Sequence, residues 1–284
     1  MATTTTLTTR LITRSRKIFS PSLIGALIIL IPVLIIAFAP SVVTHLNPTD
    51  QDFDAIFAPP SAAHLFGADN YGRDVFTRTV YATGLDLQIG VFCVIFPFLF
   101  GSLMGILSGY FGGWLDVLTM RAVDVVIAFP FIVLVIAIVA MLGPGLQNMY
   151  IAVSMVGWIV YARIVRAEVL IIRNSEYIEA ARVLGYSRWR IVLRHILPNA
   201  ITPALVFIAS DVTLCILLGT TLSFLGLGAQ PPTPEWGAMI SEGRGFLTQA
   251  WWVSVFPGLA IALVGIGFSL LGDGIADLLR VGQR

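Results

Sequence analysis

The sequence predicts an all-α protein that crosses a lipid bilayer several times, and three observations lead to this fold class. Of its 284 residues, 57% are hydrophobic and only 12% are charged, against about 25% charged residues in an ordinary soluble domain. The mean hydropathy of +0.90 is too high for a soluble domain, which must cover much of its surface with polar groups. Several apolar stretches also approach the roughly 20 residues that a helix needs to cross a bilayer.

The apolar stretches predict six transmembrane helices, at about 22–40, 85–110, 115–142, 148–166, 200–218 and 252–272. They form a single transmembrane domain, 21–284, that follows a polar tail, 1–20. The first stretch is longer than the apolar part of a signal peptide and Pro40 follows it directly, so a retained helix is favoured over a cleaved signal. Function is expected in the three long polar segments between these helices, which are 41–84, 167–199 and 219–251.

The distribution of charge predicts the orientation of these helices. Seven arginines lie between Arg163 and Arg194, whereas the segment from Ser41 to Tyr81 carries five aspartates and two arginines. Loops rich in arginine and lysine remain in the cytoplasm. The segment 167–199 is therefore expected inside, and 41–84 and 219–251 are expected outside. Six crossings place both termini on the cytoplasmic side, in agreement with the basic cluster that precedes the first helix.

The cytoplasmic segment predicts a hairpin of two short helices. Ser175 is placed to cap the first helix and Gly185 to end it, while Ser187 is placed to cap the second and Pro198 to stop it. At 100° per residue, one face of the second helix is expected to be apolar and the other to carry arginines. The apolar face consists of Trp189, Val192, Leu193, Ile196 and Leu197. From periodicity alone, a docking element and a basic loop that only fixes topology are both open.

Composition also excludes several classes of function. The only lysine, Lys17, has no glycine-rich loop before it, so the chain has no P-loop with which to hydrolyse ATP. The formal net charge of +1 gives no reason to expect a nucleic-acid partner. Cys93 and Cys215 each lie in an apolar run and are expected to pack as small hydrophobic residues. Three scattered histidines, His45, His64 and His195, do not form a metal-binding constellation.

Several blocks of the sequence resemble one transporter family. The stretch Glu179–Gly185, with Ile191 and Leu197-Pro198 downstream, is similar to the EAA loop of the permease subunits of binding-protein-dependent ABC importers. The stretch His64–Arg78 resembles a signature of the dipeptide, oligopeptide and nickel permeases. The resemblance covers roughly residues 20–280 and points to the C-type member of a permease pair. Further similar blocks are Gly109–Trp114, Met120–Asp124, Ser223–Gly228, Pro231–Met239, Phe256–Gly258 and Leu271–Gly274.

The resemblance implies a site at each side of the membrane. On the cytoplasmic side it implies coupling helices that dock in a cleft of an ATPase subunit, with the residues Glu179, Ala180, Ala181, Gly185, Ile191, Leu197 and Pro198. Small alanines permit close approach, and glycine permits the sharp turn. On the external side the family signature corresponds to His64, Gly67, Asp69, Gly72, Arg73, Asp74 and Arg78.

The resemblance also implies partners and a substrate class. The expected partners are a homologous second permease subunit, one or two ABC ATPase subunits, an extracellular or periplasmic substrate-binding protein, and membrane lipid. ATP and Mg²⁺ would bind to the ATPase subunits, so this chain is expected to have no cofactor or metal and not to be an enzyme. The expected location is the bacterial plasma (inner) membrane. Di- and oligopeptides are the first substrate expectation, followed by nickel chelates, metallophores and haem.

Two acidic residues in apolar surroundings are candidates for the translocation path. An ionised carboxylate at the bilayer centre costs about 2.5–3.5 kcal/mol, so Asp211 is expected to face the bundle interior. There it would either meet the ammonium group of a peptide or be paired with neighbouring helices. Asp86 is expected to begin the second helix, where a capping role is favoured over a path role. A secondary transporter that uses Asp211 and Asp86 to couple to an ion gradient is the alternative of another class.

Overall fold

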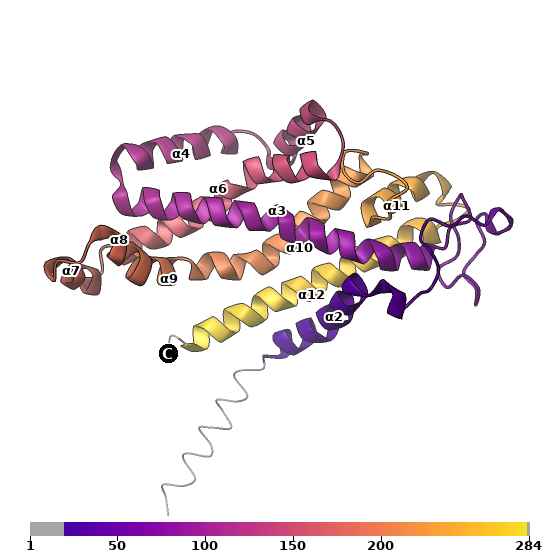
Figure 1. The fold of residues 1–284 in the computed structure, drawn as a ribbon, viewed down its shortest axis with the longest axis horizontal. Helices are drawn as coiled ribbons and strands as arrows, with labels where there is room; N and C mark the ends of the chain where they lie inside the picture. The colour runs from indigo at the N-terminus through magenta and orange to yellow at the C-terminus, as the bar shows by residue number, and fades with distance from the viewer. Residues whose placement is uncertain (1–19, 283–284) are drawn as a thin grey trace, which may run out of the picture.

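The computed structural model describes residues 20–282, and their regular structure is helical, with a single isolated bridge between Ala68 and Asp74. Figure 1 shows long helices lying side by side in an elongated bundle. The long helices are α2 (Pro21–Phe38), α3 (Val75–Phe111), α4 (Gly113–Ile127), α5 (Phe131–Leu142), α6 (Leu146–Ile172), α10 (Thr202–Phe224) and α12 (Trp252–Gly282). The predicted tail, 1–20, lies outside the described residues except for Ser20.

The closest packing in the bundle joins α3 to α6. Gly101, Gly105 and Gly109 recur every four residues and form a stripe along one face of α3. A Cβ atom at Gly101 would overlap the carbonyl oxygen of Trp158, and one at Gly105 would overlap that of Ala162. The absence of side chains on this stripe therefore lets the two backbones approach closely, which is how many helices in membranes pack.

Four of the described helices, α2, α3, α10 and α12, are long and apolar enough to cross a membrane. The pair α4 and α5 gives a fifth span if the two helices are counted together. They are bent by 88° relative to each other, so the expected single helix at 115–142 is wrong. The break falls at residues 128–130, where Pro130 has no N–H to continue the helix and disfavours helical conformation at Phe129. Pro130 itself is extended, with a ψ of 126°. The six predicted crossings stay a prediction.

Other helix boundaries also extend beyond the predicted spans. Helix α3 begins at Val75 rather than at residue 85, and the carboxylate of Asp74 caps it by accepting the backbone N–H of Thr77 at 2.7 Å. Helix α6 continues to Ile172, and α10 continues to Phe224. The predicted ends followed the apolar runs, which report the length of chain that lipid can cover. In α3 the added turns are polar, and the side chains of Thr77 and Arg78 bond to Thr44 and Asp69 of the loop end.

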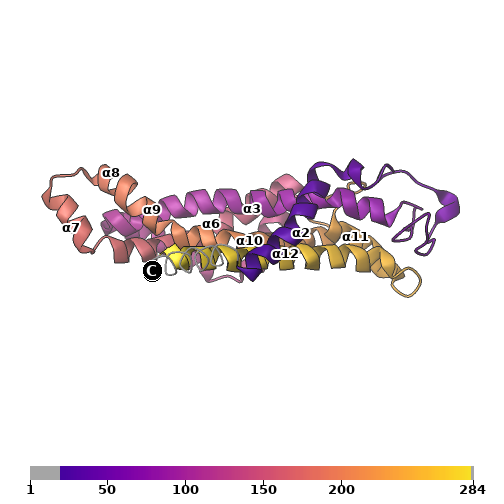
Figure 2. The ribbon, with the colours of Figure 1, turned by 90° about the horizontal axis from the view of Figure 1, so that it is seen from below.

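The two ends of the bundle differ. One end, here called the hairpin end, carries three short helices, and the other, the loop end, carries residues 39–74 and a fourth short helix (Figure 2). Helix α12 ends on the side of the hairpin (Figure 1). The short helices are α7 (Glu176–Val183), α8 (Arg188–Ile191) and α9 (Leu197–Ala200) at the hairpin end, and α11 (Trp236–Gly243) at the loop end.

Candidate functional site

Helix α7 of the hairpin separates an anchoring face from an exposed face. Ile178 is fully buried and Ala181 is 5% exposed, so these two residues hold the helix to the bundle. Glu179 and Ala180 are exposed. The two predicted alanines therefore differ in role, because Ala181 packs inward and only Ala180 lies on the free surface. Beyond them, the tip of the hairpin presents two large apolar side chains, Val183 at 88% and Leu184 at 70% exposure.

The turn of the hairpin has the geometry predicted for it. Gly185 has a φ of +78°, in the left-handed region that glycine tolerates best. Its N–H donates to the carbonyl of Arg182, and the N–H of Tyr186 donates to the carbonyl of Ala181. These two bonds form a Schellman motif, which ends α7. Ser187 caps the next helix by accepting the N–H of Arg190 at 3.3 Å, as predicted.

Two features of the hairpin differ from the prediction. Ser175 occupies the N-cap position of α7 as predicted, but its hydroxyl donates to the carbonyl of Ile172 at 2.6 Å, so the side-chain capping bond is absent. Pro198 does not stop the second helix, because the chain continues from α8 through a π-helical turn at Val192–Ile196 into α9. The wider π turn takes up the extra residue and brings Pro198 to the first turn of α9, where no N–H is required.

The π turn also changes which side chains face the bundle. Ile191, Val192 and Ile196 are almost completely buried, whereas Trp189 and Leu193 are each 57% exposed. The predicted apolar face was therefore only partly right, because it contained Trp189 and Leu193 and lacked Ile191. The exposed pair lies over α3 and lines an apolar cavity of about 210 Å³ together with Leu99, Leu103, Ile106, Leu107, Leu197 and Ile201.

The charged groups of the hairpin are not paired with one another. The Arg173 guanidinium donates to the carbonyl of Gly109 at 2.6 Å, which anchors the start of the hairpin to the end of α3. Arg182 donates to the carbonyl of Arg173, and Arg190 lies over the ring of Tyr186. Among the ion pairs of the described residues none includes Glu179, so this carboxylate is paired neither with Arg173 nor with Arg182.

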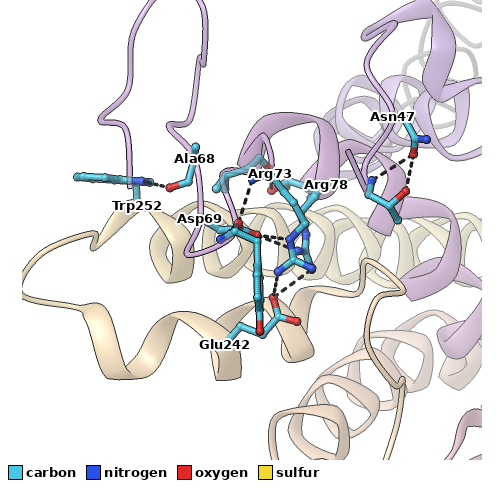
Figure 3. A network of polar contacts seen from close by, with 11 residues as sticks. Asn47, Ala68, Asp69, Arg73, Arg78, Glu242 and Trp252 are labelled. Atoms are coloured by element: carbon cyan, nitrogen blue, oxygen red, sulfur yellow. Dashed lines mark hydrogen bonds and ion pairs between the residues drawn. The ribbon is translucent and has the colours of Figure 1, made fainter. Parts of the chain in front are cut away.

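The loop end contains a buried network of four charged groups (Figure 3). Asp69 Oδ2 accepts bonds from Arg73 Nε at 2.7 Å and from Arg78 Nη1 at 2.8 Å. The same arginines reach Glu242 Oε2 of α11, at 2.7 Å from Arg73 and 3.1 Å from Arg78. Burial raises the pKa of Glu242, and the charge of Arg73 opposes that shift. The network joins the predicted signature to a helix far away in the sequence.

The other signature residues also make internal contacts. His64 Nδ1 lies 2.9 Å from Asp74 Oδ2. Gly67 and Gly72 have φ angles of +75° and +71°, and side chains there would overlap Trp252 and the backbone of Asp52. The structure therefore brings all seven predicted signature residues together in one packed region. Two partners of this region, Glu242 and Trp252, were not predicted from the sequence. The indole N–H of Trp252 donates to the carbonyl of Ala68 at 3.0 Å.

The two candidate path residues have different surroundings. Asp86 is fully buried and accepts the backbone N–H of Trp236 at 3.1 Å, so the expected cap of α3 is wrong and Asp74 has that role. Asp211 accepts a bond from the Tyr161 hydroxyl at 2.7 Å, which joins α10 to α6. A bidentate pair between Arg166 and Asp116 was also missed. These partners are 50 or more residues apart, so local spacing carries no signal of them.

Comparisons with known proteins agree with the resemblance. The family described as binding-protein-dependent transport system inner membrane component matches residues 101–282. The dipeptide transport system permease protein DppC of Alkalihalophilus pseudofirmus is 44% identical over 262 residues, which cover 91% of this chain and 84% of that protein. A probable D,D-dipeptide permease protein of Escherichia coli, DdpC, is 42% identical over 90% of this chain and 85% of its own length.

A third relative has a different named substrate. The glutathione transport system permease protein GsiD of Pectobacterium atrosepticum is 43% identical over 239 residues, which cover 83% of this chain and 79% of that protein. The family match covers most of the chain, and each of the three relatives is aligned over more than three quarters of its own length. The chain therefore belongs to the family of inner-membrane components of binding-protein-dependent transport systems.

Proposed function

We propose that this chain is the permease subunit of an ATP-driven importer of di- and oligopeptides, in which it forms half of the translocation path. The three relatives are named for dipeptides, D,D-dipeptides and glutathione, all of which are short peptides. None of these three is named for nickel, a metallophore or haem, so peptides are favoured over those alternatives. A homologous second permease subunit would supply the other half of the path.

The proposed orientation places the hairpin end in the cytoplasm and the loop end outside. The arginines between residues 163 and 194 support it, because positively charged segments remain in the cytoplasm. The C-terminal end of α12 lies toward the hairpin end, which fits a cytoplasmic C-terminus (Figure 1). With both termini inside, the chain would cross the membrane six times, with α4 and α5 forming one broken span and α6 another span.

The exposed tip of the hairpin is the observation that carries the proposal. Val183 and Leu184 project into solvent beside the unpaired carboxylate of Glu179, while Ile178 and Ala181 fix the same helix to the bundle. An apolar tip of this kind has to be covered by another protein in the assembled transporter, because contiguous exposed apolar surface marks interaction sites. We assign this surface to the cleft of an ATPase subunit.

The helices after the hairpin provide a route for the movement. From Arg188 to Phe224 the chain is helical, with one π turn and a single non-helical residue at Ile201. Closure of ATPase subunits around ATP and Mg²⁺ would push the hairpin, and this nearly continuous helical segment would rotate α10 within the bundle. The chain itself supplies the path and the coupling, and its one or two ATPase partners supply the energy.

Two further parts of the chain contribute to transport in this proposal. The loop end, which the network of Asp69 and Glu242 makes rigid, would receive the substrate-binding protein. Asp211, held by Tyr161 inside the bundle, would face the path and meet the ammonium group of a peptide. Both assignments follow from position and charge, since an ionisable residue between transmembrane helices is by default a functional candidate.

The test of the coupling role is a charge reversal on the exposed face of α7. In proteoliposomes that contain the whole transporter, Glu179→Lys is expected to abolish the stimulation of ATP hydrolysis by the loaded binding protein, since the new ammonium group faces the ATPase cleft. Asp273→Lys, an equal charge change at an exposed position of α12 outside both the hairpin and the loop end, should leave the stimulation unchanged. Normal stimulation in the Glu179 variant would refute the assignment.

A further inference from the structure

Two buried carboxyl groups meet at the loop end, apart from the network of arginines. Asp86 of α3 and Glu235, the residue that precedes α11, are both fully buried. Asp86 accepts the backbone N–H of Trp236, the residue that follows Glu235, so the two carboxyl groups lie at the same junction. Among the described residues, no arginine, lysine or histidine forms an ion pair with either carboxyl group. The transport mechanism proposed above makes no use of this pair.

The two carboxyl groups differ in the bonds they already accept. Glu235 caps α11, with Oε1 accepting the N–H of Gly237 at 3.0 Å and Oε2 accepting that of Ala238 at 2.7 Å. Such backbone bonds at a helix N-terminus stabilise an ionised carboxylate. Asp86 accepts only one bond, from the N–H of Trp236 to Oδ2, and its Oδ1 atom has no partner as an acceptor.

An unpaired oxygen in a fully buried carboxylate is costly, and so is a second negative charge beside Glu235. Two carboxylates in contact without a cation do not both remain ionised, since one of them retains a proton. A proton on Asp86 Oδ1 would remove both costs, because it takes away one negative charge and turns the unpaired acceptor into a donor. Burial also raises the pKa of Glu235, which agrees with a shared proton.

We propose that Asp86 and Glu235 hold one proton between them, bound to Oδ1 of Asp86 and donated to the Glu235 carboxylate, and that this proton fastens α11 to α3. The pair is then a proton-binding site, and both acids are positioning residues for the loop end. They act with Trp236, which is 1% exposed and whose indole N–H donates to the carbonyl of Thr79 on α3 at 3.1 Å.

The same junction includes α10, so that three elements meet at the proton. Ser241 of α11 donates to the carbonyl of Phe224 at 2.8 Å. Gly237 lies so close to α10 that a Cβ atom there would overlap the carbonyl oxygen of Thr220. Loss of the proton would therefore weaken the attachment of α11 to the helix that leads to the hairpin.

The charged groups around this junction are bonded to other residues, so the pair of Asp86 and Glu235 is the group that titrates there. Tyr150 of α6 is the other titratable group that interacts with Asp86. Arg78, two turns away on α3, is bonded to Asp69 and Glu242. Helix α12 carries no charged residue between Trp252 and Gly272, and α10 carries only Asp211. Release of the proton as pH rises would leave two negative charges without a compensating cation.

Infrared spectroscopy tests the proton directly. The chain, purified in complex with its transport partners, should show a C=O stretching band of a buried protonated carboxyl group. We expect this band to be lost in Asp86→Asn and kept in Asp54→Asn, which removes an exposed acid at the same end. Identical bands in the wild type and the Asp86→Asn variant would overturn the proposal. The readout needs no transport, so it can succeed even if the peptide-import function fails.

The pH profile of transport tests the positioning role. Since the pair retains its proton at low pH, the attachment of α11 is complete there and is lost as pH rises through the pKa of the pair. Wild-type transport should fall at alkaline pH, whereas Asp86→Asn has no proton to lose and should keep its activity. In Asp86→Ala the transport rate should fall roughly tenfold at every pH, because this substitution leaves the N–H of Trp236 without a partner. Equal defects in the asparagine and alanine variants would contradict the proposal.

Discussion

At the residue scale, Asp69 shows how a buried acid connects distant parts of the chain. Its Oδ1 atom accepts the backbone N–H groups of Tyr71 and Arg73, and its Oδ2 atom accepts bonds from the side chains of Arg73 and Arg78. The side chain is 2% exposed. A charge buried to this degree is tolerated only because each lone pair is used. The two arginines are in turn balanced by Glu242, so the four groups carry no net charge.

The substitution Asp69→Asn should therefore destabilise the protein strongly. It leaves two buried guanidinium groups with one carboxylate, and breaking one partner of a buried ion pair costs about 3–5 kcal/mol. We expect a clear fall in the thermal unfolding temperature of the purified protein, whereas Asp50→Asn, an exposed acid of the same loop, should change it little. A loss below about 1 kcal/mol, the value typical of surface pairs, would show that the network is not a stabilising centre.

The residues of this network were only half predictable from the sequence. The signature from His64 to Arg78 was found because its members lie within 15 positions of one another. Glu242 was not found, since it is 169 residues from Arg73 and its neighbours give no local pattern. The same reason explains the wrong prediction for Asp86. Its position near the start of an apolar run indicated a capping role. Its true partner, Trp236, is 150 residues away.

At the element scale, the packing of α3 against α6 depends on the stripe of glycines. Gly105 faces the backbone of α6, and a Cβ atom there would lie 2.6 Å from the carbonyl oxygen of Ala162 and 3.0 Å from the nitrogen of Arg166. Backbone atoms cannot move aside as a flexible side chain does, so the helices would have to separate. Gly258 of α12 has no atom within 4 Å of the same position.

These two glycines provide a matched pair of substitutions. Gly105→Ala should reduce stability by about 1–3 kcal/mol, the usual cost of overpacking. Gly258→Ala should be neutral or stabilise by up to about 1 kcal/mol, because alanine is the better helix former. Thermal unfolding of both variants in the same detergent measures the difference. If the two variants unfolded at the same temperature, the close approach of α3 and α6 would not contribute to stability.

The elements were more predictable than their ends. The apolar runs located the long helices, since a bilayer demands about 20 apolar residues from any span. The same rule missed Val75–Gly84 of α3, whose polar side chains are buried against the loop end rather than in lipid. It also missed the break at Pro130, which lies inside an unbroken apolar run, and the π turn that carries the chain past Pro198. In both places the local backbone, which composition does not report, decides the geometry.

At the scale of the whole molecule, the chain is a multi-pass protein of the bacterial inner membrane. Helix α3 has 37 residues and is therefore about 55 Å long, whereas the hydrocarbon core is only about 30 Å thick. Several turns must project from the membrane, and the buried polar groups of its first turns identify the loop end as the side where most of them project. The exposed polar segments at opposite ends then lie in different compartments.

Single cysteines test which compartment each end occupies. The native Cys93 and Cys215 are buried, so a membrane-impermeant thiol reagent should react with them little. We expect Gln51→Cys, exposed at the loop end, to be labelled in spheroplasts, in which the inner membrane is intact and its outer face is accessible. Arg194→Cys, exposed on the hairpin, should be labelled only in inside-out vesicles, because arginine-rich segments stay in the cytoplasm. The opposite labelling pattern would reverse the proposed orientation, and with it the assignment of the hairpin to a cytoplasmic ATPase.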